Sequence, residues 1–208
     1  MGASKLTNLP LEPFPPEEKP QSGVVVLGRF QPVHKGHELL LKEAEKWRSE
    51  NASGDNLIIA IGSSNQPLSI RNPWTSTERA EMLEKWLEST EISAFITHIP
   101  DIEDPPNWVS HAEKYHGTSG VLFTTDPETA KLYESSGWKV IIRDQKNRES
   151  FQGWRVRATA QMLSTVHDQE AIRLVLGSTI PDSVLSHIIS EDYIRRLAFM
   201  GEGGEPVG

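Results

Sequence analysis

The sequence predicts an α/β protein built on a doubly wound parallel β-sheet and followed by C-terminal helices. The first observation is that short apolar runs alternate along the chain with longer helical patterns. The second is that these runs, such as residues 24–27 and 57–61, are almost continuously apolar. Strands have this composition when crossover helices cover both faces of a parallel sheet. The third is the length, because 208 residues suffice for one such domain with a sizeable core.

The first half of the chain supplies two strands and two helices. We expect strands at residues 24–27 and 57–61, and helices at residues 34–50 and 75–89. The second helix has a capping box at its start, with Thr75 as the N-cap and Glu78 three residues later. The boundary at residue 75 is therefore predicted from a specific pair of side chains.

The second half continues the alternation and ends in helices. We expect strands at residues 94–99, 120–124 and 138–142. We expect helices at residues 107–115, 127–136, 155–164 and 181–197, the second of these starting with Pro127 in its first turn. In such a sheet, ligands bind in the crevice beyond the carboxyl ends of the strands. Four polar loops begin there, so we expect them to converge on one crevice.

The ends of the chain differ in composition from the middle. Residues 1–21 are rich in proline and poor in apolar side chains, which predicts a flexible or loosely docked tail. Residues 201–208, GEGGEPVG, predict a second flexible tail. The ordered domain is expected to span residues 22–200.

Charge and composition exclude several classes of protein. The formal net charge is −8, and this argues against a nucleic-acid partner, since duplex binders usually present a basic face. The chain has no cysteine, which excludes disulfides, thiol catalysis and cysteine-ligated zinc and fits a reducing compartment. No apolar run approaches the ~18 residues of a membrane span, and the N-terminus lacks a signal-peptide pattern. We therefore expect a cytoplasmic protein without a membrane partner.

The stretch GRFQPVHKGH, residues 28–37, is the most informative part of the sequence. Gly28 ends a strand, and Gly36 lies at a helix start, where backbone N–H groups and the helix dipole can bind an anion. His34 and His37 are three residues apart, so both imidazoles face the same side of the first helical turn. Arg29 adds a permanent positive charge. The set suits a polyphosphate, whereas the GxGxxG and P-loop motifs are both absent after this strand.

This stretch resembles the HxGH signature of the nucleotidyltransferase superfamily. Its flanking residues resemble the archaeal-type nicotinamide-nucleotide adenylyltransferases, and the similarity covers about residues 23–200. Further matching pieces are IGSS at 61–64, SIRNPWT at 69–75 with Glu78 and Arg79, IPDI at 99–102, and WV at 108–109. The resemblance implies a Rossmann-like fold, a homo-oligomer, and synthesis of NAD and pyrophosphate from nicotinamide mononucleotide and ATP, with Mg²⁺ accompanying ATP.

The resemblance also implies roles for individual residues. The implied catalytic residues are His34, His37 and Arg157. The expected ATP-binding residues are Gly28, Arg29, Phe30, Gly36, Ser63, Ser64, Arg71, Thr125, Asp126 and Gly153. Asp126 departs from the family, which more often has Ser-Gly-Asn-Pro where this chain has residues 124–127. Asp101 and Trp108 would bind the nicotinamide, because an indole face attracts a cationic pyridinium and a carboxylate accepts from a carboxamide NH₂. No side chain is expected to bind a metal directly, since Mg²⁺ is held mainly by phosphates and water.

Each of these roles has a structural alternative. Trp108 could pack under a short helix, with Asp101 simply ending a strand. Arg71 could be a surface charge, and Asp126 could serve only as a helix cap. His111 is expected to be a surface histidine.

The segment of residues 143–157 departs from the rest of the chain and from the family. It carries five basic and two acidic side chains, a net charge of +3 in an acidic protein. The family motif expected here contains hydroxyl residues, whereas this chain has Gln152-Gly153-Trp154-Arg155-Val156-Arg157, of which Gly153 and Arg157 match. Two alternatives stay open. One is another nucleotidyltransferase, acting on FMN or phosphopantetheine or dependent on CTP, against which Asp101 and Trp108 argue. The other is a nucleotide-binding regulatory module without turnover, which the lost hydroxyls favour and the intact His34 and His37 oppose.

Overall fold

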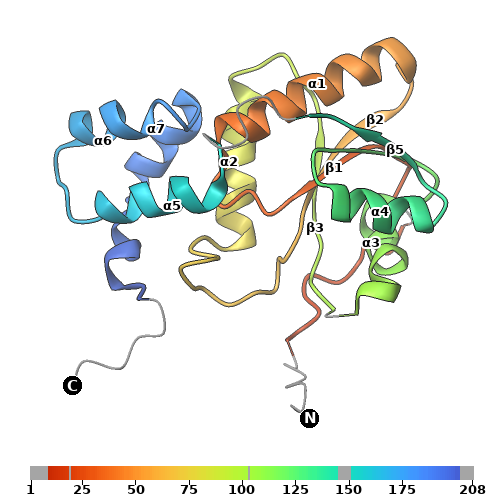
Figure 1. Cartoon of the computed structure of the whole chain (residues 1–208), viewed down its shortest axis with the longest axis horizontal. Helices are drawn as coiled ribbons and strands as arrows, with labels where there is room; N and C mark the ends of the chain where they lie inside the picture. The colour runs from red at the N-terminus through yellow and green to blue at the C-terminus, as the bar shows by residue number, and fades with distance from the viewer. Residues whose placement is uncertain (1–8, 19, 103, 145–150, 202–208) are drawn as a thin grey trace.

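The computed structural model describes residues 9–18, 20–102, 104–144 and 151–201 (Figure 1). Its sheet contains β1 (Gly23–Gly28), β2 (Asn56–Ile61), β3 (Phe95–His98), β4 (Val121–Thr124) and β5 (Lys139–Ile142). The strands lie in the order β3-β2-β1-β4-β5 and all pair in parallel. The predicted α/β class is therefore confirmed. The order of the strands reverses between β1 and β4, and this is where such sheets open a crevice for ligands.

Both faces of the sheet are buried, as the near-continuous apolar strands predicted. Successive side chains of a strand point to opposite faces. Val24 and Val26 accordingly pack in one hydrophobic core, which includes residues of α1 (Lys35–Asn51) and α2 (Ser76–Glu88). Val25 packs in the other core, with residues of α3 (Trp108–His116) and α4 (Pro127–Ser135). The sheet is therefore doubly wound and Rossmann-like.

The C-terminal helices form a group at one end of the molecule, shown in blue shades in Figure 1. This group consists of α5 (Gly153–Met162), α6 (Gln169–Leu176), α7 (Asp182–Ser190) and the 3₁₀ turn η2 (Arg195–Phe199). Its apolar side chains join the same core as α1 and α2. It therefore covers one face of the domain and brings α5 to the carboxyl edge of the sheet.

One prediction about these helices was wrong, and one helix was not predicted. A single helix over residues 181–197 was expected, but α7 ends at Ser190 because Asp192 has a left-handed φ of 54°, a conformation that interrupts a right-handed helix. The turn carries Tyr193 to Glu81, whose Oε2 accepts from the tyrosine hydroxyl at 2.6 Å. Helix α6 was not predicted, although its N-cap Asp168 accepts from two backbone N–H groups in the first turn.

The capping box at the start of α2 is confirmed. Thr75 accepts from the Glu78 backbone N–H, and the Glu78 carboxylate accepts in return from the Thr75 N–H at 2.8 Å. Glu78 also receives both terminal nitrogens of Arg196. One side chain thus caps α2 and joins it to the C-terminal helices.

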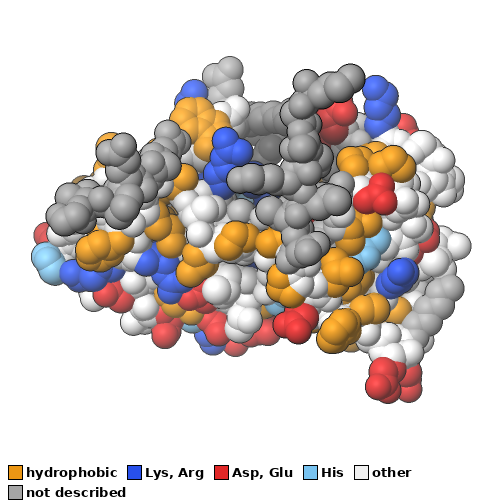
Figure 2. Space-filling view, turned by 90° about the horizontal axis from the view of Figure 1, so that it is seen from below, with side chains coloured by type: hydrophobic (Ala, Val, Ile, Leu, Met, Phe, Trp, Pro, Cys, Tyr) orange, Lys and Arg blue, Asp and Glu red, His pale blue; other side chains and the backbone are white. Residues whose placement is uncertain are grey.

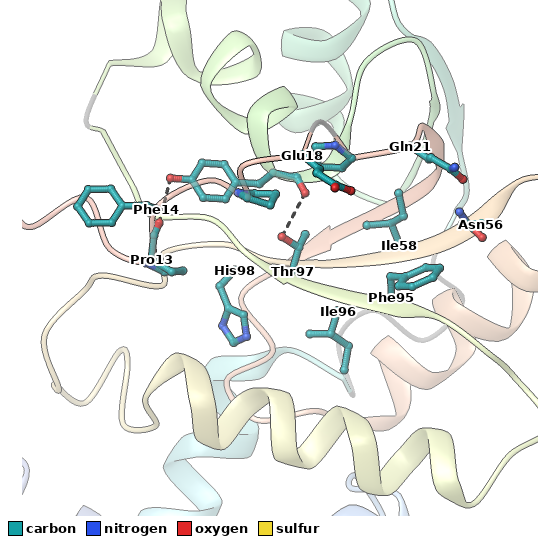
Figure 3. A pocket seen from close by; sticks show the side chains of 13 residues that line it. Pro13, Phe14, Glu18, Gln21, Asn56, Ile58, Phe95, Ile96, Thr97 and His98 are labelled. Carbon is teal, nitrogen blue, oxygen red and sulfur yellow. Dashed lines mark hydrogen bonds between the residues drawn. The ribbon is translucent and has the colours of Figure 1, made fainter.

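An N-terminal segment, residues 9–18, lies against the sheet near β3. The Pro13 carbonyl accepts from the Tyr115 hydroxyl at 3.0 Å. A groove of about 540 Å³ lies between this segment and β3, and Phe14, Phe95 and His98 are among the side chains that line it (Figure 3). The predicted flexible tails fall in part on residues 1–8 and 202–208, which lie outside the described residues.

The surface carries no single dominant type of side chain on the face seen in Figure 2. Apolar side chains are spread there between acidic and basic ones. Within the described ranges, no helix combines the length and the apolar composition needed to cross a membrane.

Candidate active site

Two pockets border the point where β1 and β4 diverge. The first, here called the basic pocket, has a volume of about 400 Å³. It is lined by Arg29, His34, Gly36, His37, Leu40, Thr125, Phe151, Gln152, Gly153, Trp154 and Arg157. The second, here called the acidic pocket, has a volume of about 350 Å³. It is lined by Leu27, Gln66, Asp101, Asp104, Pro105, Trp108, Thr129 and Leu132. The loops predicted to converge therefore meet at this edge.

The two histidines of the opening motif lie face to face in the basic pocket. Their rings stack with centroids 3.7 Å apart and an interplanar angle of 23°. They also cap α1 reciprocally: His34 Nδ1 accepts from the His37 N–H at 3.4 Å, and His37 Nδ1 accepts from the His34 N–H at 3.3 Å. The three-residue spacing thus places both rings on one side of the first turn, as predicted.

This reciprocal cap determines which ring nitrogen carries the proton. Because both Nδ1 atoms accept hydrogen bonds, each neutral ring must be protonated at Nε2. Burial and the charge of Arg157 lower the pKa of His34 to about 4. Burial, and then the proximity of His34, also lower the pKa of His37 well below its usual value. Both histidines are therefore neutral hydrogen-bond donors near pH 7.

The lowered pKa of His34 predicts a pH-dependent stability. In the unfolded chain a histidine takes up its proton near pH ~6.5, whereas folded His34 does so only at a pKa of about 4. The free energy of unfolding should therefore fall as the pH drops from about 6.5 towards 4. Above pH ~6.5 the contribution of neutral His34 to stability is fully present. Denaturant titrations of the parent and of His34→Gln between pH 4 and 7 test this. The variant should lose less stability over that range. The matched control is His167→Gln at an exposed histidine, which should behave like the parent.

Arg157 is a buried cation at the floor of the basic pocket. Only 8% of its surface is exposed, and Nη1 donates to the Gln31 carbonyl at 2.8 Å. Burial, followed by the charges of Arg29 and Arg71, lowers the pKa of Arg157 to about 10. Three guanidinium groups thus repel one another here. Such a cluster is relieved by a bound polyanion, so the arrangement favours phosphate binding.

Gly153 keeps the space beside this arginine open. A Cβ atom at residue 153 would lie 3.2 Å from Arg157 Nη1 and 3.7 Å from His34 Nε2. Any side chain would therefore occupy the space between the two donors. Helix α5 begins at Gly153, two residues before the predicted start, so its first N–H groups also face this region.

The remainder of the altered loop places an aromatic side chain at the mouth of the basic pocket. Trp154 is 58% exposed, and its Nε1 donates to Gln152 Oε1 at 2.7 Å. The Arg155 guanidinium lies 5.3 Å from the Trp154 ring centroid. Lys146, Arg148 and Glu149, which contributed to the predicted basic segment, lie outside the described residues.

The acidic pocket contains the two residues predicted to bind a nicotinamide ring. Asp101 and Trp108 both line it, together with Asp104 and the amide side chain of Gln66. The Gln66 amide donates to Asp101 Oδ2 at 3.1 Å. Trp108 is half-buried, and its ring lies 6.3 Å from that of Tyr133. The pocket thus offers an aromatic face beside two carboxylates.

Some predicted site residues lie behind the pockets. Phe30 is buried and packs on His37 with ring centroids 4.7 Å apart. Gly28 makes this possible, since a Cβ there would lie 3.1 Å from the Phe30 ring. Ser63 has a left-handed φ of 53°, and the hydroxyl of Ser64 is buried without a hydrogen-bond partner in the described part of the chain.

Two further predicted residues have contacts that a cap or a surface charge would make. Asp126 is the N-cap of α4, where it accepts from the Thr129 backbone N–H at 3.1 Å, while its neighbour Thr125 lines the basic pocket. Arg71 is exposed, yet its charge lowers the pKa of Arg157. The capping function of Asp126 is therefore present, and Arg71 lies within electrostatic range of the basic pocket.

The sequence assigned no role to Arg79 beyond its match to the family, and the structure shows that only 1% of its surface is exposed. Its Nη1 donates to the carbonyls of Arg29 at 2.7 Å and Gly62 at 2.9 Å, and its Nη2 donates to the Ser63 carbonyl at 3.1 Å. Burial, and then the charge of Arg29, lower its pKa to about 10. Arg79 thus joins the loops that follow β1 and β2. Its place after the Thr75–Glu78 capping box is the signal that could have drawn attention to it.

The prediction for His111 was wrong, because this histidine is buried. Only 9% of its surface is exposed, and its Nε2 lies 2.9 Å from the Pro100 carbonyl. The short helix α3 turns this side chain inward against the loop that carries Asp101. Among the described residues, no three His, Asp or Glu side chains gather in an arrangement that could hold a metal ion.

Comparison with known proteins identifies the family of this chain. The family model described as Cytidylyltransferase-like matches residues 25–179. The nicotinamide-nucleotide adenylyltransferase of Thermoplasma acidophilum is 31% identical over 92% of this chain and 98% of its own length. The enzyme of the same name from Pyrococcus horikoshii is 33% identical over 82% of this chain and 84% of its own.

Solved structures share the fold. A bifunctional NMN adenylyltransferase/ADP ribose pyrophosphatase from Francisella tularensis, complexed with AMP and a manganese ion, has a TM-score of 0.60 at 19% identity. The match covers 86% of this chain and 52% of that protein, so this chain spans about half its length. Nicotinic acid mononucleotide adenylyltransferase from Plasmodium falciparum has a TM-score of 0.51 at 12% identity, over 84% and 98% of the two chains. The chain belongs to the cytidylyltransferase-like family and, within it, to the archaeal-type nicotinamide-nucleotide adenylyltransferases.

Proposed function

We propose that this protein is an adenylyltransferase that joins nicotinamide mononucleotide and ATP to give NAD and pyrophosphate. The observation that carries the proposal is the opposite charge of two neighbouring pockets. The described residues that line the basic pocket include Arg29 and Arg157 and no carboxylate. Those that line the acidic pocket include Asp101 and Asp104 and no Lys or Arg. A polyphosphate suits the first pocket and a cationic pyridinium ring suits the second.

The reaction requires positioning and charge stabilisation, with no covalent enzyme intermediate. The 5′-phosphate oxygen of the mononucleotide attacks the α-phosphorus of ATP in line, and the bond from that phosphorus to the bridging oxygen of the β-phosphate breaks. The electron pair leaves with pyrophosphate. The Nε2–H groups of His34 and His37 would donate to phosphate oxygens as this charge develops. Arg29, Arg71 and Arg157 would hold the polyphosphate.

The metal would enter with the nucleotide. Mg²⁺ binds phosphate oxygens and water readily, and needs few protein ligands in such sites. The donor set of the basic pocket fits this, since its histidines present Nε2–H groups and its arginines are cations, which suits phosphate oxygens better than a metal ion. The Mg²⁺ of a Mg-ATP substrate would supply further neutralisation of charge. A homo-oligomer and a cytoplasmic location stay predictions from the sequence.

Replacing Trp108 by alanine should raise KM for nicotinamide mononucleotide more than KM for ATP. The indole holds the acceptor ring in the ground state and in the transition state alike, and cation–π contacts contribute ~0.5–2 kcal/mol. We therefore expect an increase of about 2- to 30-fold in that KM with a small change in kcat. Steady-state kinetics with each substrate varied in turn measures this. Equal increases for both substrates, or a collapse of thermal stability, would instead indicate a packing role.

The activity itself is tested with a panel of acceptors. Purified protein is incubated with Mg-ATP and either nicotinamide mononucleotide, nicotinate mononucleotide, FMN or phosphopantetheine, and with CTP in place of ATP. Pyrophosphate release and the product mass are recorded. NAD should form fastest. A faster reaction with FMN, phosphopantetheine or CTP would replace the proposed substrate, and ATP binding without any turnover would favour the regulatory module.

A further inference from the structure

The side chain of Asn65 forms hydrogen bonds with two separate parts of the chain, the loop at Asp101 and the N-terminal segment at Pro10. Its Oδ1 accepts from the Asp101 backbone N–H at 2.8 Å, and its Nδ2 donates to the Asp101 carbonyl at 3.0 Å. The same Nδ2 donates to the Pro10 carbonyl at 3.0 Å. An amide side chain has two N–H donors, and both are engaged here. Asn65 therefore holds Asp101 by both of its backbone polar groups.

Asp101 depends on such contacts because no regular element contains it. It lies in the loop after β3, which ends at His98. Besides Asn65, the Gln66 amide donates to its carboxylate, and His111 bonds the carbonyl of the preceding Pro100. Among the residues that the structure describes, only Asn65 hydrogen-bonds to the Asp101 peptide groups themselves. The direction in which the carboxylate enters the acidic pocket thus follows from this side chain.

The bond to Pro10 extends the connection to the N-terminal segment. Residues 9–18 are held at two points, by Asn65 at Pro10 and by the Tyr115 hydroxyl at Pro13. Figure 3 shows the second of these contacts at the end of the groove beside β3. Tyr115 makes no contact with Asp101 through its hydroxyl, so the two attachments can be separated by mutation.

We propose that Asn65 is a positioning residue for nicotinamide recognition: it aims Asp101 into the acidic pocket and is itself braced by residues 9–18. This inference rests on the proposed function. A loss of Asn65 should therefore act on the acceptor substrate and leave the ATP side of the reaction unchanged.

The test is steady-state kinetics of the full chain carrying Asn65→Ala. We expect KM for nicotinamide mononucleotide to rise about 10-fold, as for the loss of two hydrogen bonds, with kcat and KM for ATP within about twofold of the parent. Asn65→Asp keeps the acceptor for the Asp101 N–H but loses both donors, and should raise the same KM. Tyr115→Phe, the matched control, should leave it unchanged. If Asn65→Ala does not fold, the KM of Asn65→Asp for nicotinamide mononucleotide tests the proposal by itself.

A double-mutant cycle separates positioning from a general structural effect. Asp101→Ala removes the carboxylate that Asn65 is proposed to aim. Adding Asn65→Ala to it should then raise KM for the acceptor little further, because the two residues act through one contact. Additive effects, equal increases of KM for both substrates, or a Tyr115→Phe variant as impaired as Asn65→Ala would each overturn the proposal.

The activity of the parent enzyme separates a failure of the proposed function from a failure of the role proposed for Asn65. If it does not convert nicotinamide mononucleotide, the proposed function fails and this proposal fails with it. If it does so and Asn65→Ala retains the parent KM, only the role of Asn65 is overturned.

Discussion

Replacing His37 by alanine is expected to lower kcat by about 10²–10³-fold, the usual cost of removing one pre-organised donor to developing charge. The structure supplies the reason. His37 Nδ1 accepts from the backbone of His34, so its proton must reside on Nε2, in a ring that is stacked at 3.7 Å against its partner. The donor is thus oriented before any substrate binds. Steady-state kinetics with saturating Mg-ATP and nicotinamide mononucleotide measures the loss.

The same histidine caps α1, and a second variant separates the two functions. Glutamate at the third helical position is a common partner in capping boxes. The carboxylate of His37→Glu can therefore accept from the His34 N–H and restore the cap, but it has no N–H donor to take the place of Nε2. We expect its thermal unfolding to approach that of the parent while kcat stays low. Recovery of both would assign His37 to the cap alone.

Replacing Arg157 by alanine is expected to reduce kcat by about 10²-fold or more, because its charge is buried beside both histidines and pre-positioned by the Gln31 carbonyl. Arg157→Lys should recover only part of the rate, since an ammonium group cannot reproduce a bidentate fork on a phosphate. Arg155→Ala is the matched control, because Arg155 is exposed in the same helix. Kinetics of the three variants measure these effects.

The departure of the loop from the family makes this prediction informative. Hydroxyl groups expected near the phosphates are replaced by Gln152 and Trp154, whose side chains bond each other. If guanidinium charge replaces them, Arg157→Ala is severe and Arg155→Ala mild. An Arg157→Ala variant with parental kcat would show that the family motif corresponds to other residues in this chain.

Much of the fold could be predicted because its signals are local. Continuous apolar runs specified the five strands within two residues of their observed ends, and the Thr75–Glu78 pair specified the start of α2. The break after Ser190 could not be predicted, because it depends on a contact between residues distant in sequence. The left-handed φ of Asp192 turns the chain so that the Tyr193 hydroxyl reaches Glu81. Helix α6 was overlooked although its signals are local, since Asp168 as N-cap precedes eight amphipathic residues.

The site was predictable only as far as its residues cluster in motifs. His34 and His37 are three residues apart at the start of a helix, and this spacing predicts that their rings lie on the same side of it, where they stack. Arg79 and Asn65 donate to carbonyl groups of loops that the sheet brings together. These partners are distant in sequence, so the residues around Arg79 and Asn65 do not predict them. His111 was expected at the surface, and it is the packing of α3 against the Pro100 loop that turns it inward.

The buried guanidinium of Arg79 has a consequence for the field that an incoming nucleotide meets. The carboxyl edge of a parallel sheet presents carbonyl oxygens, each with partial negative charge, towards the ligand crevice. Arg79 binds three of them, from Arg29, Gly62 and Ser63, and places a full positive charge behind them. The guanidinium charge offsets the partial negative charges of these carbonyls, which would otherwise repel a polyanion. We therefore expect part of the affinity for a triphosphate to originate in Arg79, a side chain that lies behind these carbonyls and outside the lining of the basic pocket.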